Sequence, residues 1–314
     1  MKGSARFGAV LLIGFGGPER REEIRPFLDR VTRGRAIPRE RYEEVVRHYE
    51  AIGGRSPFNE ITNRQLAALR ERLAGSGIRI PVALGLRNAA PYLDDVLEQL
   101  ARDGVQRVLG FVLAAHRCEA SWDRYLQNVE QARSRIGAGA PAVDYPGPWH
   151  AHPQFVEAAA ERVAEALARL DPPERDGAKL IFTAHSIPLA MAAASRYVEQ
   201  LTDSARRIAE RLRRHEWTLA FQSRSGGPRD PWLEPDVRRV LRGLGGYAVV
   251  VAPIGFLSDH VEVLYDLDFE AAGVAREAGV TMVRAATVGD HPRFIEMMAA
   301  LIAHRLRTEP QHSG

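Results

Sequence analysis

The stretch AVVVAPIGFLSDHVEVLYDLDFE, residues Ala248–Glu270, decides how this chain folds. Its apolar first part has the composition of a buried strand, and its second part has the spacing of a helix. Glu262, Asp266 and Glu270 recur every four residues, so an α-helix would place them on one side, about one turn apart. Like charges at this spacing destabilise an isolated helix, and a solvated acidic face is the alternative. The apolar residues Val261, Leu264, Tyr265 and Phe269 and the buried strand before the helix favour a functional role, more for Glu262 than for Glu270.

A second segment, LIFTAHSIP at Leu180–Pro188, has the same form of a strand that runs into a polar loop. It places His185 just past the end of the strand, among small and apolar neighbours. Burial there would favour the neutral, basic form of the imidazole. A histidine that only holds a loop by hydrogen bonds is an equal alternative. A histidine and a file of acids at strand ends indicate proton abstraction, with an acidic route for protons or a metal ion.

Short apolar runs rich in Val, Ile and Leu alternate with stretches of helical period along the chain. Continuous apolar strands separated by helices favour parallel sheets that helices cover on both faces. The expected strands are Val10–Phe15, Ile80–Leu86, Arg107–Ala114, Ala142–Tyr145, Lys179–Thr183, Thr218–Gln222, Tyr247–Pro253 and Thr281–Ala285. They fall into two sets of four with similar loops, which is a pseudo-repeat of pattern and not of residues.

The pattern predicts an α/β fold of two Rossmann-like domains, each a four-stranded parallel sheet flanked by helices, with a cleft between them. The segment PGPWHAHP, Pro146–Pro153, suits a boundary. We therefore divide the chain into residues 1–147 and 148–314, and the last helix, about Pro292–Leu306, could pack back across the join. Ligands of open parallel sheets sit beyond the carboxyl ends of the strands, so the cleft is the expected site.

Composition narrows the class of protein. The hydrophobic fraction of 45% and the charged fraction of 26% are ordinary for a globular protein. A net charge of +3, without a basic run or an aromatic platform, fits an acidic small ligand and gives no support for nucleic acid. The single cysteine, Cys118, excludes an all-cysteine iron–sulfur site within one chain. The apolar run Ala9–Phe15 is too short to span a membrane. We expect a cytoplasmic monomer with at most peripheral membrane contact.

Several long motifs, in order, resemble those of one family. They are GFGGPE at Gly14–Glu19, YEAIGGRSPFNEIT at Tyr49–Thr62, TAHSIP at Thr183–Pro188, FQSRSGGPRDPWLEPDV at Phe221–Val237, and PIGFLSDHVEVLYDLDFE at Pro253–Glu270. With them the chain resembles the ferrochelatases, which insert ferrous iron into a porphyrin. The resemblance implies a chelatase-like fold with porphyrin in the cleft, and no cofactor beyond the substrate Fe²⁺.

The resemblance also assigns roles to residues of this chain. His185 and Glu262 match the catalytic pair, and Asp266 and Glu270 match an acidic line that leads away from it, so these four are the expected metal-handling residues. A neutral His185 close to Glu262 could accept the pyrrole protons that leave as the metal enters. The residues expected to contact porphyrin are Phe15, Arg33, Arg35, Ser56, Tyr125 and Trp232.

The segment between Phe27 and Tyr49 resembles the short form found in soluble coproporphyrin III ferrochelatases. Arg33 and Arg35 match an arginine motif of that group, so coproporphyrin III is the favoured substrate. Phe15, however, stands where those enzymes usually have an iron-ligating tyrosine and where protoporphyrin enzymes tend to have methionine. Protoporphyrin IX therefore stays open as the alternative.

Rival interpretations come from other classes. A non-catalytic tetrapyrrole carrier could use the same cleft, but it would not need His185 and Glu262 together. A chelatase for sirohydrochlorin would share the doubled fold, although the motifs WLEPD and SDHVEVLYD point away from it. A nucleotide-binding role is weakly supported, because GFGGPE lacks the spacing of GxGxxG and of a P-loop.

Overall fold

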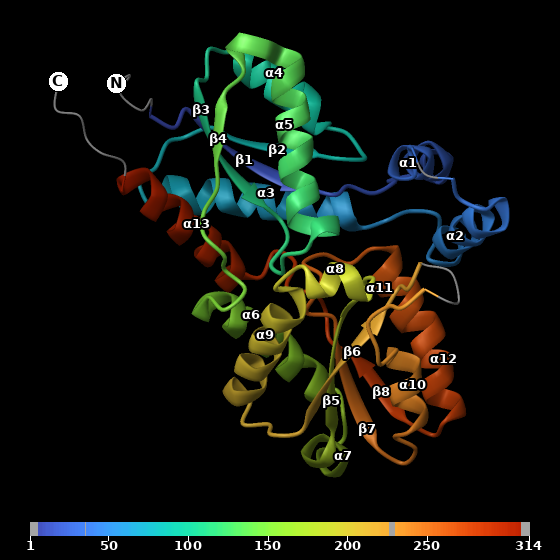
Figure 1. The fold of residues 1–314 in the computed structure, drawn as a ribbon. Helices are drawn as coiled ribbons and strands as arrows, with labels where there is room; N and C mark the ends of the chain where they lie inside the picture. The colour runs from blue at the N-terminus through green and yellow to red at the C-terminus, as the bar shows by residue number, and fades with distance from the viewer. Residues whose placement is uncertain (1–5, 35, 226–229, 309–314) are drawn as a thin grey trace.

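The computed structural model describes residues 6–34, 36–225 and 230–308, and it contains two parallel sheets. The first occupies the upper half of Figure 1 and the second the lower half. The strands are β1 (Ala9–Gly14), β2 (Val82–Leu86), β3 (Arg107–Val112) and β4 (Ala142–Asp144) in the first sheet, and β5 (Lys179–His185), β6 (Trp217–Gln222), β7 (Ala248–Ala252) and β8 (Thr281–Arg284) in the second. All the expected strands are present, and the predicted fold class is confirmed.

The two sheets repeat one strand order. The first runs β2-β1-β3-β4 and the second β6-β5-β7-β8, so β5 takes the place in its sheet that β1 takes in the other. All pairings between neighbouring strands are parallel. In each sheet the second strand lies on one side of the first strand, and the third strand lies on the other side. This reversal opens a crevice between β1 and β3, and between β5 and β7, at their carboxyl ends.

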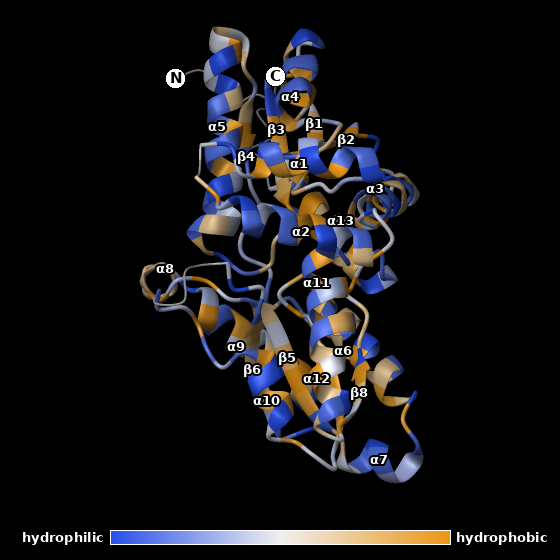
Figure 2. Ribbon diagram, turned by 90° about the vertical axis from the view of Figure 1, so that its right-hand side faces the viewer, coloured by the Kyte–Doolittle hydropathy of each residue, from blue (hydrophilic) through white to orange (hydrophobic). Residues whose placement is uncertain are grey.

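Helices cover both faces of each sheet because strand side chains alternate between the faces. In the first sheet Val10 and Leu12 pack in the cluster that contains Leu69 of α3 (Phe58–Gly75). Leu11 and Ile13 pack in the cluster formed with α4 (Leu93–Arg102) and α5 (Arg124–Ile136). In Figure 2 the strands are largely hydrophobic, and the helices beside them carry hydrophilic segments.

The second sheet follows the same rule. The helices α6 (Pro153–Leu167) and α9 (Tyr197–Arg211) share a cluster with the strand residues Leu180 and Phe182. On the other face Ile181 packs with α10 (Val237–Arg242) and α12 (Ala272–Glu277). The remaining α-helices are α1 (Ile24–Val31), α2 (Arg39–Ala51), α7 (Pro172–Gly177), α8 (Leu189–Ala193), α11 (Val261–Tyr265) and α13 (Pro292–Arg307).

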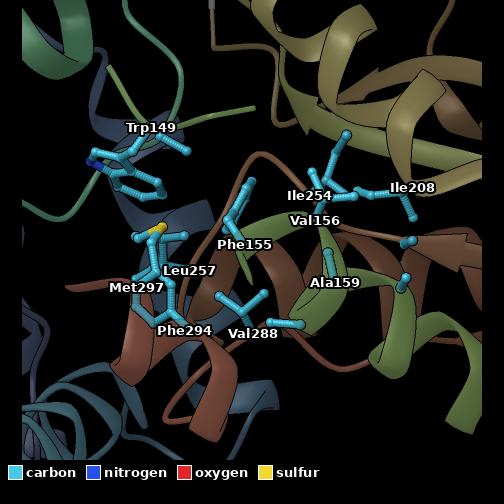
Figure 3. Packing of buried hydrophobic residues seen from close by; sticks show 14 of the residues in the cluster. Trp149, Phe155, Val156, Ala159, Ile208, Ile254, Leu257, Val288, Phe294 and Met297 are labelled. Carbon is cyan, nitrogen blue, oxygen red and sulfur yellow. The ribbon is translucent and has the colours of Figure 1, made fainter. Parts of the chain in front are cut away.

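The last helix, α13, packs against α3 of the first half and α6 of the second. Figure 3 shows its Phe294 close to Trp149 and Phe155, with ring centroids 5.7 and 6.3 Å away. The side chain of Gln65 on α3 also donates a hydrogen bond to the carbonyl oxygen of Gly289, just before α13. Buried aromatic rings contribute much of the apolar area of a core, so these contacts hold the two sheets in a fixed relation.

Candidate active site

A cavity of about 1050 Å³ lies where the carboxyl ends of the two sheets meet. Its wall includes Phe15, directly after β1, and His185, the last residue of β5. Residues of α1, α2 and α11 complete parts of the wall. The volume is at the upper end of the range for small-molecule sites, and the position is the one where doubly wound sheets bind ligands.

His185 is held by its neighbours in one orientation and one tautomer. Its Nδ1 lies in hydrogen-bond contact with the carbonyl oxygen of Ser186, and a carbonyl can only accept, so Nδ1 carries a proton. The Tyr197 hydroxyl donates to the carbonyl oxygen of His185 at 3.1 Å. Nε2 is therefore the ring atom that is left to exchange a proton in the cavity.

Glu262 lies opposite that nitrogen. The distance from His185 Nε2 to Glu262 Oε1 is 3.4 Å, and both residues line the cavity. Gly255 makes this approach feasible, since a Cβ there would come 2.5 Å from the Cβ of Ala184. With glycine, the loop after β7 packs directly on the end of β5, and Gly255 N donates to Thr183 O at 3.0 Å.

The electrostatics of the pair differ from the expectation of a neutral histidine. Burial lowers the pKa of His185, but the Glu262 carboxylate and the Ser186 carbonyl outweigh it and raise the pKa to about 8. For Glu262, burial acts to raise the pKa, while His185 and then His260 bring it down to about 2. The expectation was wrong because it took burial as the deciding effect, whereas the charge of the facing carboxylate outweighs it. At neutral pH the free site holds an imidazolium–carboxylate pair.

The other two acids line the same cavity but do not continue one straight α-helix. The α-helix α11 ends at Tyr265, and a π-helical turn follows at Asp266–Ala271. The α-helical form predicted for this segment is therefore wrong beyond Tyr265, although Glu262, Asp266 and Glu270 all line the same cavity. Asp266 accepts a hydrogen bond from the Ser223 hydroxyl, and Glu270 is 3.0 Å from Nη1 of Arg238.

Asp266 titrates near neutrality. Burial raises its pKa, the Ser223 hydrogen bond opposes this, and the charges of Glu262 and Glu270 add to it, giving a pKa of about 7. A carboxyl with such a pKa can take up and release a proton at physiological pH. Asp266 is thus suited to pass protons between the His185–Glu262 pair and the cavity.

Only some of the residues expected to contact porphyrin line the cavity. Phe15, Ser56, Tyr125 and Trp232 all line the cavity. Trp232 lies beside the segment after His185, since Pro188 and Trp232 form an antiparallel bridge. Arg33 is exposed and does not line the cavity, and Arg35 lies outside the described residues.

The site also contains residues that the sequence motifs did not predict. Gln222 pairs in register with His185, and its side-chain amide donates to the carbonyl oxygen of Glu262. The guanidinium of Arg87 lies 5.5 Å from the ring centroid of Phe15. Arg124, at the start of α5, also lines the cavity. The position of Gln222 at the end of a strand beside β5 was the available signal for that residue.

Two observations apply to the described part of the chain. No three His, Cys, Asp or Glu side chains there converge closely enough to hold a metal ion by themselves. No helix in those ranges has the length and apolar character needed to cross a bilayer.

Comparisons of the sequence with known proteins identify its family. The ferrochelatase family model matches residues 8–306. A protein of Rhodopirellula baltica named ferrochelatase is 43% identical over 305 residues, covering 96% of this chain and 86% of that protein. A coproporphyrin III ferrochelatase of Nocardia farcinica is 42% identical over 309 residues, covering 95% and 88%. That of Mycolicibacterium smegmatis is 42% identical over 310 residues, covering 97% and 91%.

Among solved structures, SirB from Bacillus subtilis with Fe³⁺ superposes with a TM-score of 0.59 at 14% identity, covering 96% of this chain and 97% of that chain. The sirohydrochlorin chelatase SirB of the subspecies spizizenii, in complex with cobalt, gives a TM-score of 0.54 at 14% identity, covering 95% and 93%. At this identity the likeness concerns the fold alone. The family match along nearly the whole chain and the identity above 40% show that the chain belongs to the ferrochelatase family, the enzymes that insert ferrous iron into porphyrins.

Proposed function

We propose that this ferrochelatase inserts Fe²⁺ into coproporphyrin III and that His185 and Glu262 carry out the step. The observation that supports this most is the 3.4 Å contact between His185 Nε2 and Glu262 Oε1 in the wall of a large cavity. A base beside an ionised carboxylate is what the reaction needs, because two pyrrole protons must leave while a dication enters.

The pKa values suggest an order of events. The pair holds a proton on His185 at neutral pH, so this proton must leave before Nε2 can accept one from a pyrrole. Asp266, with a pKa of about 7, is suited to receive it. Glu262 stays ionised throughout the neutral range and attracts the incoming metal ion. Glu270 is paired with Arg238 and would extend the acidic side of the cavity.

Two observations support coproporphyrin III as the porphyrin. Close relatives from Nocardia farcinica and Mycolicibacterium smegmatis are named for that substrate. The cavity wall also contains several arginines, among them Arg41, Arg87 and Arg124, and coproporphyrin III carries four propionates. Phe15 favours the alternative, protoporphyrin IX, because this apolar ring supplies no ligand for iron.

Anaerobic insertion of Fe²⁺, followed by the porphyrin absorption spectrum, tests the proposal with both porphyrins in parallel. We expect faster turnover of coproporphyrin III in the wild type and loss of insertion in His185→Ala. The matched control is His215→Ala, since His215 is an exposed histidine that does not line the cavity. Porphyrin binding without insertion in the wild type would support a carrier and refute the enzyme. A preference for protoporphyrin IX would refute the substrate.

Further expectations from the sequence remain proposals. They are the division into residues 1–147 and 148–314, a monomer in the cytoplasm with at most peripheral membrane contact, and no cofactor or iron–sulfur cluster beside the substrate iron. Sedimentation equilibrium tests the monomer, and fractionation of cells tests the location and the membrane contact. Metal analysis of the purified protein tests the absence of a cofactor or cluster. Limited proteolysis tests the division, since a cut near residue 147 should give two fragments.

A further inference from the structure

We propose that Arg124 binds a propionate of the substrate and thereby selects a porphyrin with four acidic side chains over one with two. The inference deepens the proposed function and rests on coproporphyrin III being the substrate. Arg124 is the first residue of α5, lines the cavity, and precedes Tyr125, which lines it too. It therefore lies where a porphyrin side chain can reach it.

Arg124 has hydrogen-bonding capacity to spare. A guanidinium has five N–H donors, and the partner of Arg124 among the described residues is Glu119, at 3.0 Å from Nη2. This contact is a single hydrogen bond to a side chain that is 55% exposed. The Nε of Arg124 is buried and has no hydrogen-bond partner in the described part of the chain. A second carboxylate could thus be bound without breaking an existing network.

Another cavity arginine, Arg238, is more fully committed. It binds Asp236 through two nitrogens, at 2.8 and 3.0 Å, and reaches Glu270 at 3.0 Å. Because Arg238 already saturates its carboxylate-binding edges inside the protein, Arg124 is the better candidate for a ligand from outside.

The chemistry of the two porphyrins makes this position selective. Coproporphyrin III carries propionates at the positions where protoporphyrin IX carries vinyl groups. A propionate gains a charge-assisted, two-point contact with a guanidinium, whereas a vinyl group gains nothing from it. A porphyrin with a vinyl group at this position forgoes the contact, so the site favours the porphyrin with four propionates.

The test measures kcat and KM for anaerobic Fe²⁺ insertion into each porphyrin, in the wild type and in Arg124→Met and Arg124→Lys. We expect Arg124→Met to lose roughly ten-fold or more in kcat/KM for coproporphyrin III, mostly through KM, which corresponds to about 1.4 kcal/mol. The value for protoporphyrin IX should stay unchanged, and lysine should recover part of the loss. The matched control is Arg135→Met, since Arg135 is on the same helix but is 59% exposed, outside the cavity and paired with Asp94 at 2.6 Å.

A fluorescence titration with metal-free coproporphyrin III gives a readout that does not depend on catalysis. A higher Kd in Arg124→Met, with no change in Arg135→Met, supports the contact between Arg124 and a propionate. A wild type that prefers protoporphyrin IX would overturn the proposed substrate and, with it, the selective role of Arg124. An unchanged Kd, or an equal loss for both porphyrins in the insertion assay, overturns the role of Arg124 and leaves the proposed function standing.

Discussion

Replacing Glu262 by glutamine tests the electrostatic account of the site directly. Glu262→Gln keeps the size of the side chain but removes the charge 3.4 Å from His185 Nε2. Two unit charges at that distance interact by about 1 kcal/mol in water and about 5 kcal/mol at an effective dielectric constant of 20. The pKa of His185 is about 8 instead of 6.5. At 1.36 kcal/mol per pH unit this net rise is roughly 2 kcal/mol, and because burial opposes it, the attraction that raises the pKa is larger than the net value.

We expect the pKa of His185 in Glu262→Gln to fall from about 8 to about 6.5 or lower, because burial then meets less opposition. The ring Cε1–H signal, followed by NMR titration and identified with His185→Ala, measures this value. The sign for stability follows from the same values. In the wild type the pair stabilises the fold below about pH 6.5, and this contribution is lost as the pH rises through about 8.

The matched control for this variant is Glu60→Gln. Glu60 is 61% exposed on α3, where it pairs with Arg64 at 2.9 Å, and it does not line the cavity. Glu60→Gln removes one negative charge, as Glu262→Gln does, but leaves the His185–Glu262 contact unchanged. A His185 that still titrates near 8 in Glu262→Gln, or that moves equally in the control, would refute the reasoning.

Three further outcomes follow from the structure. Burial raises the pKa of Asp266 from 3.8 to about 7, so its ionisation costs stability as the pH rises through this window. Asp266→Asn should therefore gain more in Tm over the wild type at pH 8 than at pH 5, measured by calorimetry. Arg284 binds Asp259 at 3.2 Å and Asp268 at 2.7 Å, two acids that lie on either side of Glu262 in the sequence. Arg284→Met leaves both carboxylates without this partner and should lower the free energy of unfolding by about 3–5 kcal/mol in urea titrations. Phe294→Ala empties a fully buried position on α13, and a loss of about 3–5 kcal/mol is expected in the same titrations.

For each of these three substitutions a control variant separates the proposed physical cause from non-specific destabilisation of the fold. Asp95→Asn removes an exposed acid on α4, and an equal gain at pH 8 there would contradict the account of Asp266. Arg284→Lys keeps one charge, so it should lose less than Arg284→Met. Phe294→Leu keeps most of the buried volume, and a loss as large as that of alanine would show that packing is not the cause.

The fold could be predicted because local signals and chain order agree, whereas the pairing of His185 with Glu262 was implied by the resemblance to the ferrochelatases. Strand and helix periods fix the two sheets, and a parallel sheet brings the residues after its central strands to one edge. The sequence pattern therefore placed His185 and the acids that follow the next strands near the edge where a ligand binds. The neighbouring positions of β5 and β7, which bring His185 and Glu262 together, were known only from the structure.

The protonation state of the His185–Glu262 pair could not be predicted. Nor could the contacts of Arg284 with Asp259 and Asp268. The pKa of His185 depends on a distance of a few ångströms to a carboxylate that is distant in sequence. Arg284 reaches Asp259 and Asp268 from β8, and no motif announces the contact. The spacing of the acids along the sequence gives no signal for the π-helical turn at Asp266–Ala271.

The repeated strand order explains how one fold can treat the two sides of a flat ligand differently. Phe15 and His185 occupy corresponding places, at the ends of β1 and β5, and both line the cavity. On the first side the wall is an aromatic ring next to the Arg87 guanidinium. On the second side it is an imidazole facing Glu262, with Asp266 beyond. On the proposed function, protons must therefore leave on the side of the second sheet. The first sheet can hold the ring but offers no base at this position, because the phenylalanine there has no atom that could take up a proton.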